Sequence, residues 1–86
     1  MTVPFETLKA LVVDDYERIR RQLSELLVEL GLEVTEAGDG LEALDRLHEV
    51  SDFDIVFTDI VMPKMDGFEL LQTVRKSPTL RHLPIV

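Results

Sequence analysis

Continuous apolar runs alternate with amphipathic stretches along the chain. Residues 8–13 and 54–58 are dominated by apolar side chains, which is typical of strands buried on both faces of a parallel sheet. In residues 33–37, Val34 and Thr35 lie between two acids, and this pattern predicts a short strand at the sheet edge. Residues 83–86 predict the beginning of a fourth strand.

Three amphipathic helices are predicted between the strands, over residues 16–30, 39–48 and 66–76. Gly31 supplies the stop signal of the first helix, and Pro78 ends the third because the residue before a proline avoids the helical region. The second and third helices start at an Asp that is followed three residues later by Glu, a variant of the capping box. The side chains expected to face the core are Ile19, Leu23, Leu26, Leu27 and Leu30 in the first helix, Leu41, Leu44 and Leu47 in the second, and Phe68, Leu71 and Val74 in the third.

The order of these elements, βαβαβαβ, predicts an α/β fold with a doubly wound parallel sheet and right-handed connections. In such a sheet, ligands bind beyond the carboxyl ends of the strands, where the strand order reverses. If strands 8–13 and 54–58 are neighbours, the residues that directly follow them will meet at that point.

The composition limits the chain to one small domain. Its 86 residues are 45% hydrophobic and 30% charged, and the formal net charge is -8. A chain this acidic, with scattered basic residues, is not expected to bind nucleic acid or an anionic membrane. The absence of cysteine excludes disulfides and thiolate metal sites. No apolar stretch approaches the roughly 20 residues that cross a bilayer, and no leader peptide is visible, so we expect a cytoplasmic protein.

Three aspartates directly follow the two apolar strands. Asp14 and Asp15 come after residues 8–13, and Asp59 comes after residues 54–58. A single acid after a strand more often caps a helix than binds a ligand, but three at neighbouring strand ends favour a site. Carboxylates this close repel one another and favour a bound cation. Hard oxygen ligands with room for water favour Mg²⁺, with Mn²⁺ as a substitute.

Such a site suits phosphoryl transfer. A carboxylate beside bound Mg²⁺ can attack a phosphoryl donor and form an aspartyl-phosphate. We assign this role to Asp59, which stands alone at its strand end, and the metal-holding role to the pair Asp14 and Asp15. Asp39 and Asp66 are interpreted as helix caps, because the Glu three residues after each accounts for them locally.

Two segments carry a family resemblance. Residues 12–15 (VVDD) resemble the acid pair, and residues 59–67 (DIVMPKMDG) resemble the phosphoacceptor segment, of the CheY-like receiver domain of two-component response regulators. The resemblance covers nearly the whole chain. It implies a flavodoxin-like sheet, with residues 1–86 forming the N-terminal part of a single receiver domain that lacks the last helix, strand and helix.

The resemblance also assigns roles to individual residues. Asp59 would accept a phosphoryl group from the phosphohistidine of a sensor histidine kinase or a phosphotransfer protein. Asp15 and Asp59 would ligate Mg²⁺ directly, Asp14 would act chiefly through bound water, and the backbone carbonyl of Val61 would complete the protein ligands. The only catalysis implied is the gain and loss of the chain's own phosphoryl group, so the chain is not expected to be an enzyme in any other sense.

Receiver domains continue beyond the segments present in this chain. In the family, a hydroxyl residue follows the fourth strand and a lysine ends the fifth, and the 86 residues stop before both. The lysine reduces the negative charge around the phosphoaspartate, and the hydroxyl residue couples the site to a switching surface. We therefore expect a chain that holds the site, is impaired in switching, and associates with another copy through an exposed sheet edge.

Two other functions compete with this interpretation. A haloacid-dehalogenase-like phosphatase also uses a strand-end Asp and Mg²⁺, but it requires a second Asp two residues after the nucleophile, where this chain has Val61. The other is a non-phosphorylated interaction or oligomerisation module, either because the truncation disables the chemistry or because the parent protein works by association.

Overall fold

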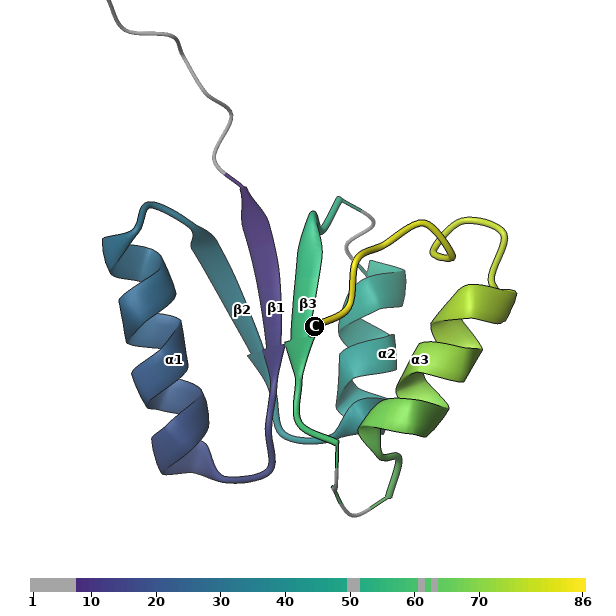
Figure 1. Cartoon of the computed structure of the whole chain (residues 1–86), viewed down its shortest axis with the longest axis horizontal. Coiled ribbons are helices and arrows are strands. Elements are labelled where there is room, and N and C mark those ends of the chain that lie inside the picture. The colour runs from purple at the N-terminus through teal and green to yellow at the C-terminus, as the bar shows by residue number, and fades with distance from the viewer. Residues whose placement is uncertain (1–7, 50–51, 61, 63) are drawn as a thin grey trace, which may run out of the picture.

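The chain folds into three parallel strands and three helices. The computed structural model describes residues 8–49, 52–60, 62 and 64–86. The elements follow in the order β1 (Lys9–Val13), α1 (Glu17–Glu29), β2 (Glu33–Ala37), α2 (Gly40–Glu49), β3 (Ile55–Thr58) and α3 (Gly67–Lys76). Figure 1 shows α1 on one face of the sheet and α2 and α3 on the other, as predicted for a doubly wound fold.

β1 lies at the centre of the sheet. The strand order is β2-β1-β3, and both pairs are parallel. The register aligns Val13 with Ala37 on one side and with Thr58 on the other. These pairings confirm that residues 33–37 form an edge strand and that β1 and β3 are neighbours. The strand order therefore reverses at β1, where doubly wound sheets place their ligands.

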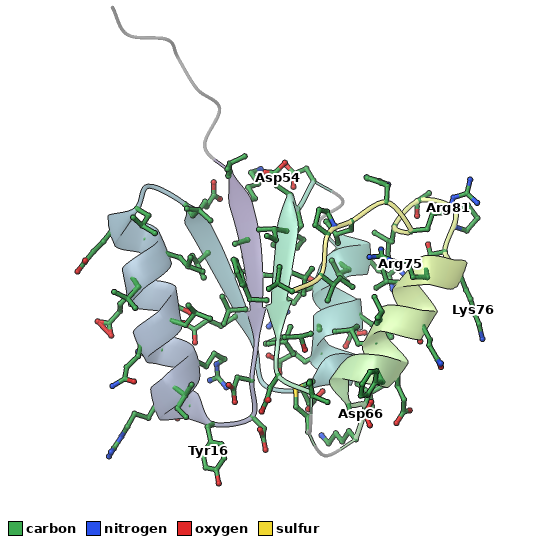
Figure 2. The ribbon with its side chains drawn as sticks, in the orientation of Figure 1. Tyr16, Asp54, Asp66, Arg75, Lys76 and Arg81 are labelled. Carbon is green, nitrogen blue, oxygen red and sulfur yellow. The ribbon has the colours of Figure 1, made fainter. Side chains whose placement is uncertain are left out.

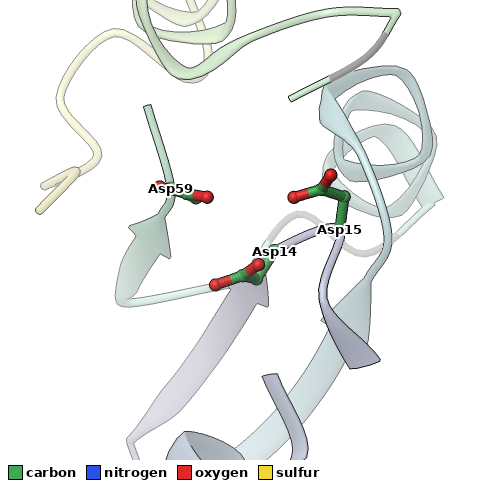
Figure 3. A group of neighbouring side chains, drawn as sticks. All are labelled: Asp14, Asp15 and Asp59. Atoms are coloured by element: carbon green, nitrogen blue, oxygen red, sulfur yellow. The ribbon is translucent and has the colours of Figure 1, made fainter. Parts of the chain in front are cut away.

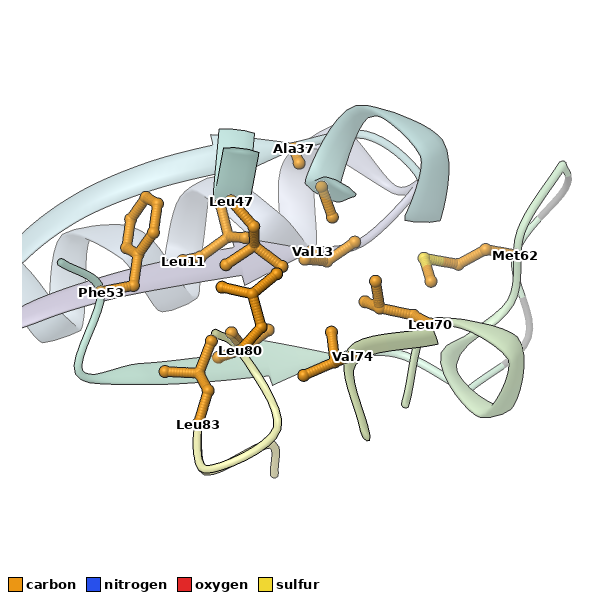
Figure 4. Close-up of a cluster of buried hydrophobic side chains, with 12 residues drawn as sticks. Leu11, Val13, Ala37, Leu47, Phe53, Met62, Leu70, Val74, Leu80 and Leu83 are labelled. Carbon is orange, nitrogen blue, oxygen red and sulfur yellow. The ribbon is translucent and has the colours of Figure 1, made fainter. Parts of the chain in front are cut away.

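The side chains of β1 alternate between two unequal cores. Leu11 and Val13 belong to a large buried cluster with α2 and α3, whereas Ala10 and Val12 belong to a smaller cluster with α1. The alternation follows from the two-residue period of a strand. Figure 4 shows the larger cluster, whose buried members are Leu11, Val13, Ala37, Ala43, Leu47, Phe53, Val56, Met62, Leu70, Val74, Leu80 and Leu83.

The buried faces of α2 and α3 match the predicted ones in part: Leu47 and Val74 are buried as predicted. Leu41 and Phe68, which were expected in the core, are 48% and 63% exposed. Ala43 and Leu70 are buried instead. Helical periodicity locates the apolar stripe of a helix, but this stripe is wider than the surface that packs against neighbouring elements. The packing of α2 and α3 on each other and on the sheet therefore decides which residues of the stripe are buried.

On the other face, α1 also leaves much of its predicted core face exposed. Leu27 is buried against the sheet, but Ile19, Leu26 and Leu30 are 54%, 59% and 76% exposed. We call these three residues the α1 stripe. They are exposed because α1 is the only described helix on its face of the sheet and no second helix packs beside it.

The caps of α2 and α3 form as predicted. The Asp39 carboxylate accepts a hydrogen bond from the Glu42 backbone N–H at 2.8 Å, and the Asp66 carboxylate accepts one from the Glu69 backbone N–H at 2.9 Å. Figure 2 shows Asp66 at the start of α3, with basic side chains at the opposite end. This distribution of charge complements the helix dipole.

α1 ends just before Gly31, which acts as the predicted stop signal. Gly31 has a φ of 97°, in the left-handed region. Its N–H donates to the Val28 carbonyl at 2.9 Å, and the Leu32 N–H donates to the Leu27 carbonyl at 3.0 Å. The bond from Leu32 to Leu27 is characteristic of a Schellman motif, which satisfies carbonyls at the helix end and turns the chain toward β2.

Residues 83–86 do not form a full fourth strand. They run parallel to β3 but make one isolated bridge, between Val56 and Ile85. The Val56 N–H donates to the Pro84 carbonyl at 2.9 Å, and the Val86 N–H donates to the Val56 carbonyl at 2.8 Å. The Thr58 N–H also donates to the Val86 carbonyl at 3.0 Å, so the hydrogen bonds to β3 continue through the last described residue. The prediction that residues 83–86 begin a fourth strand is confirmed in position and direction.

Replacing Gly31 by alanine will destabilise the protein. An added Cβ at this position meets no atom within 4 Å, so the loss comes from the left-handed backbone and amounts to about 1–2 kcal/mol of the free energy of unfolding. Gly31→Asn will lose less, because asparagine tolerates this region. Urea unfolding measures both. Gly38→Ala is the control, because Gly38 lacks a left-handed φ; an equal loss in Gly38→Ala would contradict the explanation.

Candidate functional site

The three predicted aspartates converge at the carboxyl edge of the sheet. Asp14 follows β1 and Asp59 follows β3, and the register pairs the preceding residues, Val13 and Thr58. One carboxylate oxygen from each of Asp14, Asp15 and Asp59 lies within 4.8 Å of the other two. Figure 3 shows the three carboxyl groups directed toward a common space. The structure therefore brings together every side chain that was predicted to hold the metal.

Backbone hydrogen bonds extend the sheet into the site. The Asp59 N–H donates to the Val13 carbonyl at 2.9 Å, and the Asp14 N–H donates to the Ala37 carbonyl at 3.1 Å. Each bond continues the parallel pairing one residue past the strand ends. The sheet, rather than a free loop, therefore sets the backbone positions of Asp14 and Asp59.

Local hydrogen bonds orient two of the three carboxylates. Asp14 Oδ1 accepts a hydrogen bond from the Tyr16 N–H at 2.9 Å, and Asp59 Oδ1 accepts one from the Ile60 N–H at 2.8 Å. Asp15 is exposed, and its carboxylate accepts no hydrogen bond from any residue that the structure describes. The direction of the Asp15 side chain therefore depends on the backbone between β1 and α1.

The three carboxylates have no basic partner among the described residues. Two basic groups close to these acids in sequence pair with other acids: Arg20 pairs with Glu36, and Lys64 lies 3.7 Å from Asp39. Three formal negative charges thus share a small volume without a counter-charge from the described chain. Coulomb repulsion between them favours a bound cation.

Two other predictions concern the rim of the site. Asp39 and Asp66 cap helices and stay outside the cluster, as predicted. Lys64, which pairs with Asp39, has a φ of 62°, an uncommon conformation for a residue with a side chain. Val61, whose backbone carbonyl was predicted as a ligand, lies outside the described residues.

Close backbone approaches hold the loop between β3 and α3. The Gly67 N–H donates to the Ile60 carbonyl at 2.8 Å, and a Cβ on Gly67 would overlap the Asp59 carbonyl oxygen. The Gly40 N–H donates to the Met65 carbonyl at 3.1 Å, and a Cβ on Gly40 would overlap the same oxygen. The sequence indicated these glycines only as helix starts; their second role, close contact with the site loop, is visible only in the structure.

Comparison with known proteins decides the family. The sequence profile described as "Response regulator receiver domain" matches residues 10–86. The chain belongs to this family. Family membership confirms the resemblance in residues 12–15 and 59–67, and it leaves the haloacid-dehalogenase alternative without support.

Relatives of this receiver include CheY proteins. It is 45% identical to "Chemotaxis protein CheY-3" of Vibrio cholerae over 82 residues. This alignment covers 94% of this chain and 62% of the relative. It is 45% identical to "Chemotaxis protein CheY" of Pseudomonas aeruginosa over 80 residues, in an alignment that covers 92% of this chain and 64% of the relative. A crystal structure of CheY4 from Vibrio cholerae matches with a TM-score of 0.87 at 39% identity, over 93% of this chain and 66% of that chain. The chain therefore spans just under two thirds of the length of these relatives.

Receiver domains are generally non-enzymatic signalling domains of two-component systems, and they typically bind Mg²⁺ at an acidic pocket. The cluster of Asp14, Asp15 and Asp59 is an acidic site that could hold a metal ion in this receiver. In the part of the chain that the structure describes, no helix has the length and apolar character needed to span a membrane.

Replacing Gly67 by alanine will disturb the site and the fold together. The added methyl group overlaps the Asp59 carbonyl oxygen, so either Asp59 or the start of α3 must shift, at a cost of about 1–3 kcal/mol. Urea unfolding measures the loss, and the NMR shift of the Asp59 amide reports the displacement. Gly38→Ala is the control, because a Cβ there lies 3.6 Å from its nearest neighbour. A Gly67→Ala protein that matches this control in both measurements would refute the steric explanation.

Proposed function

We propose that this receiver accepts a phosphoryl group on Asp59, with Mg²⁺ held by Asp14, Asp15 and Asp59. One observation carries the proposal: oxygens of the three carboxylates lie within 4.8 Å of one another where the strand order reverses. Acids placed there without a basic partner suit a cation and an anionic substrate that arrives with it.

The donor set fits Mg²⁺. This ion is usually bound by one or two carboxylates, keeps several waters and accepts substrate phosphates. Asp15 is exposed and Asp14 is half-buried, so water and a phosphoryl group have access to the site. When bound, Mg²⁺ supplies positive charge that offsets the carboxylates and the transferring group. The backbone carbonyl of Val61 is a further proposed ligand.

Asp59 carries out the chemistry in this proposal. Its Oδ1 accepts the Ile60 N–H, which leaves Oδ2 as the nucleophilic oxygen. Oδ2 attacks the phosphorus of the donor, and the new O–P bond forms as the P–N bond to the donor histidine breaks. The histidine nitrogen keeps the bonding electrons and is released as part of a neutral imidazole after taking up a proton. Asp14 and Asp15 bind the ion and do not react.

The wider role extends the same proposal. We place residues 1–86 in the N-terminal part of a single receiver domain. The phosphoryl donor is a sensor histidine kinase or a phosphotransfer protein, and the protein works in the cytoplasm. Beyond gaining and losing its own phosphoryl group, it catalyses no reaction.

Asp59→Asn will abolish phosphorylation. Wild-type protein treated with acetyl phosphate and Mg²⁺ will gain the mass of one phosphoryl group, and will not do so after Mg²⁺ is chelated. Asp59→Asn will gain nothing, because the amide oxygen is a poor nucleophile, and Asp15→Asn will react more slowly at the same Mg²⁺ concentration. Asp45→Asn, which removes an exposed acid from α2, will behave like wild type. Mass spectrometry decides, and phosphorylation that survives in Asp59→Asn would refute the assignment.

A second candidate function is association with another copy of the chain, favoured by the exposed α1 stripe. The sequence predicted association through a sheet edge; residues 84–86 bond along the outer edge of β3, whereas the outer edge of β2 has no partner strand among the described residues. The α1 stripe is a further surface that we propose for association. If the two-fold axis is perpendicular to the two α1 helices, they pack antiparallel, and Arg18 of each copy approaches Glu29 of the other. Both residues are exposed, which leaves them available for these pairs.

Leu26→Glu will prevent this association. A charge in the middle of the α1 stripe would be buried without a partner in the dimer. Sedimentation velocity over a range of protein concentrations measures the mass. Val28→Glu is the matched control, because Val28 is 57% exposed on the same helix but lies on a different side from the stripe. A wild-type protein that stays monomeric at every concentration excludes this function.

A further inference from the structure

Arg20 connects two elements that flank the acidic cluster. It lies in the first turn of α1, and its side chain is only 17% exposed. Its Nε donates to Glu36 Oε1 on β2 at 2.8 Å, and its Nη1 donates to the backbone carbonyl of Asp14 at 2.9 Å. The guanidinium group therefore ties the loop after β1 to the edge strand of the sheet.

The carbonyl that Arg20 holds belongs to the peptide unit between Asp14 and Asp15. Because a peptide unit is planar, a bond to its oxygen also restricts the direction in which the chain reaches the next Cα. The peptide unit before Asp14 is restricted as well, since the Asp14 N–H donates to the Ala37 carbonyl at 3.1 Å. Both peptide units around Asp14 are thus tethered, one to β2 directly and one through Arg20 and Glu36.

Asp15 depends on this tether more than its two partners do. The carboxylates of Asp14 and Asp59 each accept a backbone N–H, whereas the Asp15 carboxylate has no such bond within the described part of the chain. Asp15 is also exposed, so packing does not confine its side chain. Its backbone is the remaining means of directing it.

We propose that Arg20 is a positioning residue for the metal site, which holds the peptide unit between Asp14 and Asp15 so that the Asp15 carboxylate faces Asp59. This inference rests on the proposed Mg²⁺ function and concerns how one ligand is held. Arginine suits the task because its planar, forked group can donate to two acceptors at once, whereas a lysine ammonium is a single point of charge.

Arg21 provides a matched control. Its Nε lies 3.4 Å from Glu36 Oε2, and its side chain is 58% exposed. Arg21 therefore neighbours the same acid as Arg20, but it makes no bond to the loop after β1 among the described contacts. Replacing either residue by glutamine removes one positive charge beside Glu36, and only the Arg20 substitution releases the Asp14 carbonyl.

Magnesium titrations followed by NMR give the first test. Arg20→Gln will bind Mg²⁺ about 10-fold more weakly than wild type, whereas Arg21→Gln will differ by less than about twofold, because residues that orient a metal ligand affect affinity on this scale. Arg20→Lys keeps the charge but lacks the fork and will also bind more weakly than wild type. Equal affinities for Arg20→Gln and Arg21→Gln would overturn the proposal.

Amide hydrogen exchange in Mg²⁺-free protein gives a test that needs no metal. The Tyr16 N–H, which donates to Asp14 Oδ1, will exchange faster in Arg20→Gln than in Arg21→Gln, while amides of β1 will be unchanged. If wild type fails to bind Mg²⁺, the proposed function fails and this test still decides the role of Arg20. Unchanged Tyr16 exchange in Arg20→Gln would show that Arg20 does not hold the loop.

Glu36→Ala tests whether the bond to Glu36 holds Arg20 in place. It also serves as the test variant if Arg20→Gln does not fold. Freeing Arg20 from β2 will weaken Mg²⁺ binding several-fold. If Glu36 acts through Arg20, the double variant will bind no more weakly than Arg20→Gln alone. Additive losses, or unchanged affinity in Glu36→Ala, would refute the connection through Glu36.

Discussion

The parallel pairing of β1 with β3 is the constraint on which the site depends. Parallel strands end at the same edge of a sheet, so the residues that follow Val13 and Thr58 emerge side by side. The bond from the Asp59 N–H to the Val13 carbonyl extends this pairing beyond the strands. Asp14 and Asp59 are 45 residues apart in sequence, and the register alone makes them neighbours. A shift of register would separate the carboxylates without changing a single residue of the motif.

The two faces of the sheet serve different purposes. α2 and α3 enclose the larger core, which gives β1 and β3 a rigid base. α1 alone covers part of the other face, and its contact with the sheet centres on Leu27 and Leu23. The site lies where both layers meet the carboxyl edge, so its loops lead into α1 on one side and α3 on the other. Burial therefore stabilises the strands, while the acids stay within reach of solvent.

Backbone contacts, more than side-chain packing, position the site loops. Gly67 lets α3 start against the Asp59 carbonyl, and Gly40 lets the loop after β3 rest on the start of α2. On the opposite side, Arg20 reaches the Asp14 carbonyl from α1. Asp14 and Asp59 each accept one backbone N–H, and none of the three carboxylates pairs with a basic side chain among the described residues. The chain also restrains the peptide units to which these acids are attached.

Most of the strand and helix positions, the helix caps and the acid cluster were predictable from the sequence, because they depend on local chemistry. Apolar runs specify buried strands, Asp39 and Asp66 satisfy N–H groups of the helices they start, and Gly31 adopts the left-handed conformation that follows α1. The exposure of Leu41 and Phe68 and the bonds of Arg20 were not predictable. They depend on how elements distant in sequence pack, and a periodic pattern does not record which part of an apolar stripe is covered or which carbonyl a guanidinium reaches. The sequence by itself determined which residues could react, and the tertiary structure decided how they are held, because orientation comes from contacts between elements.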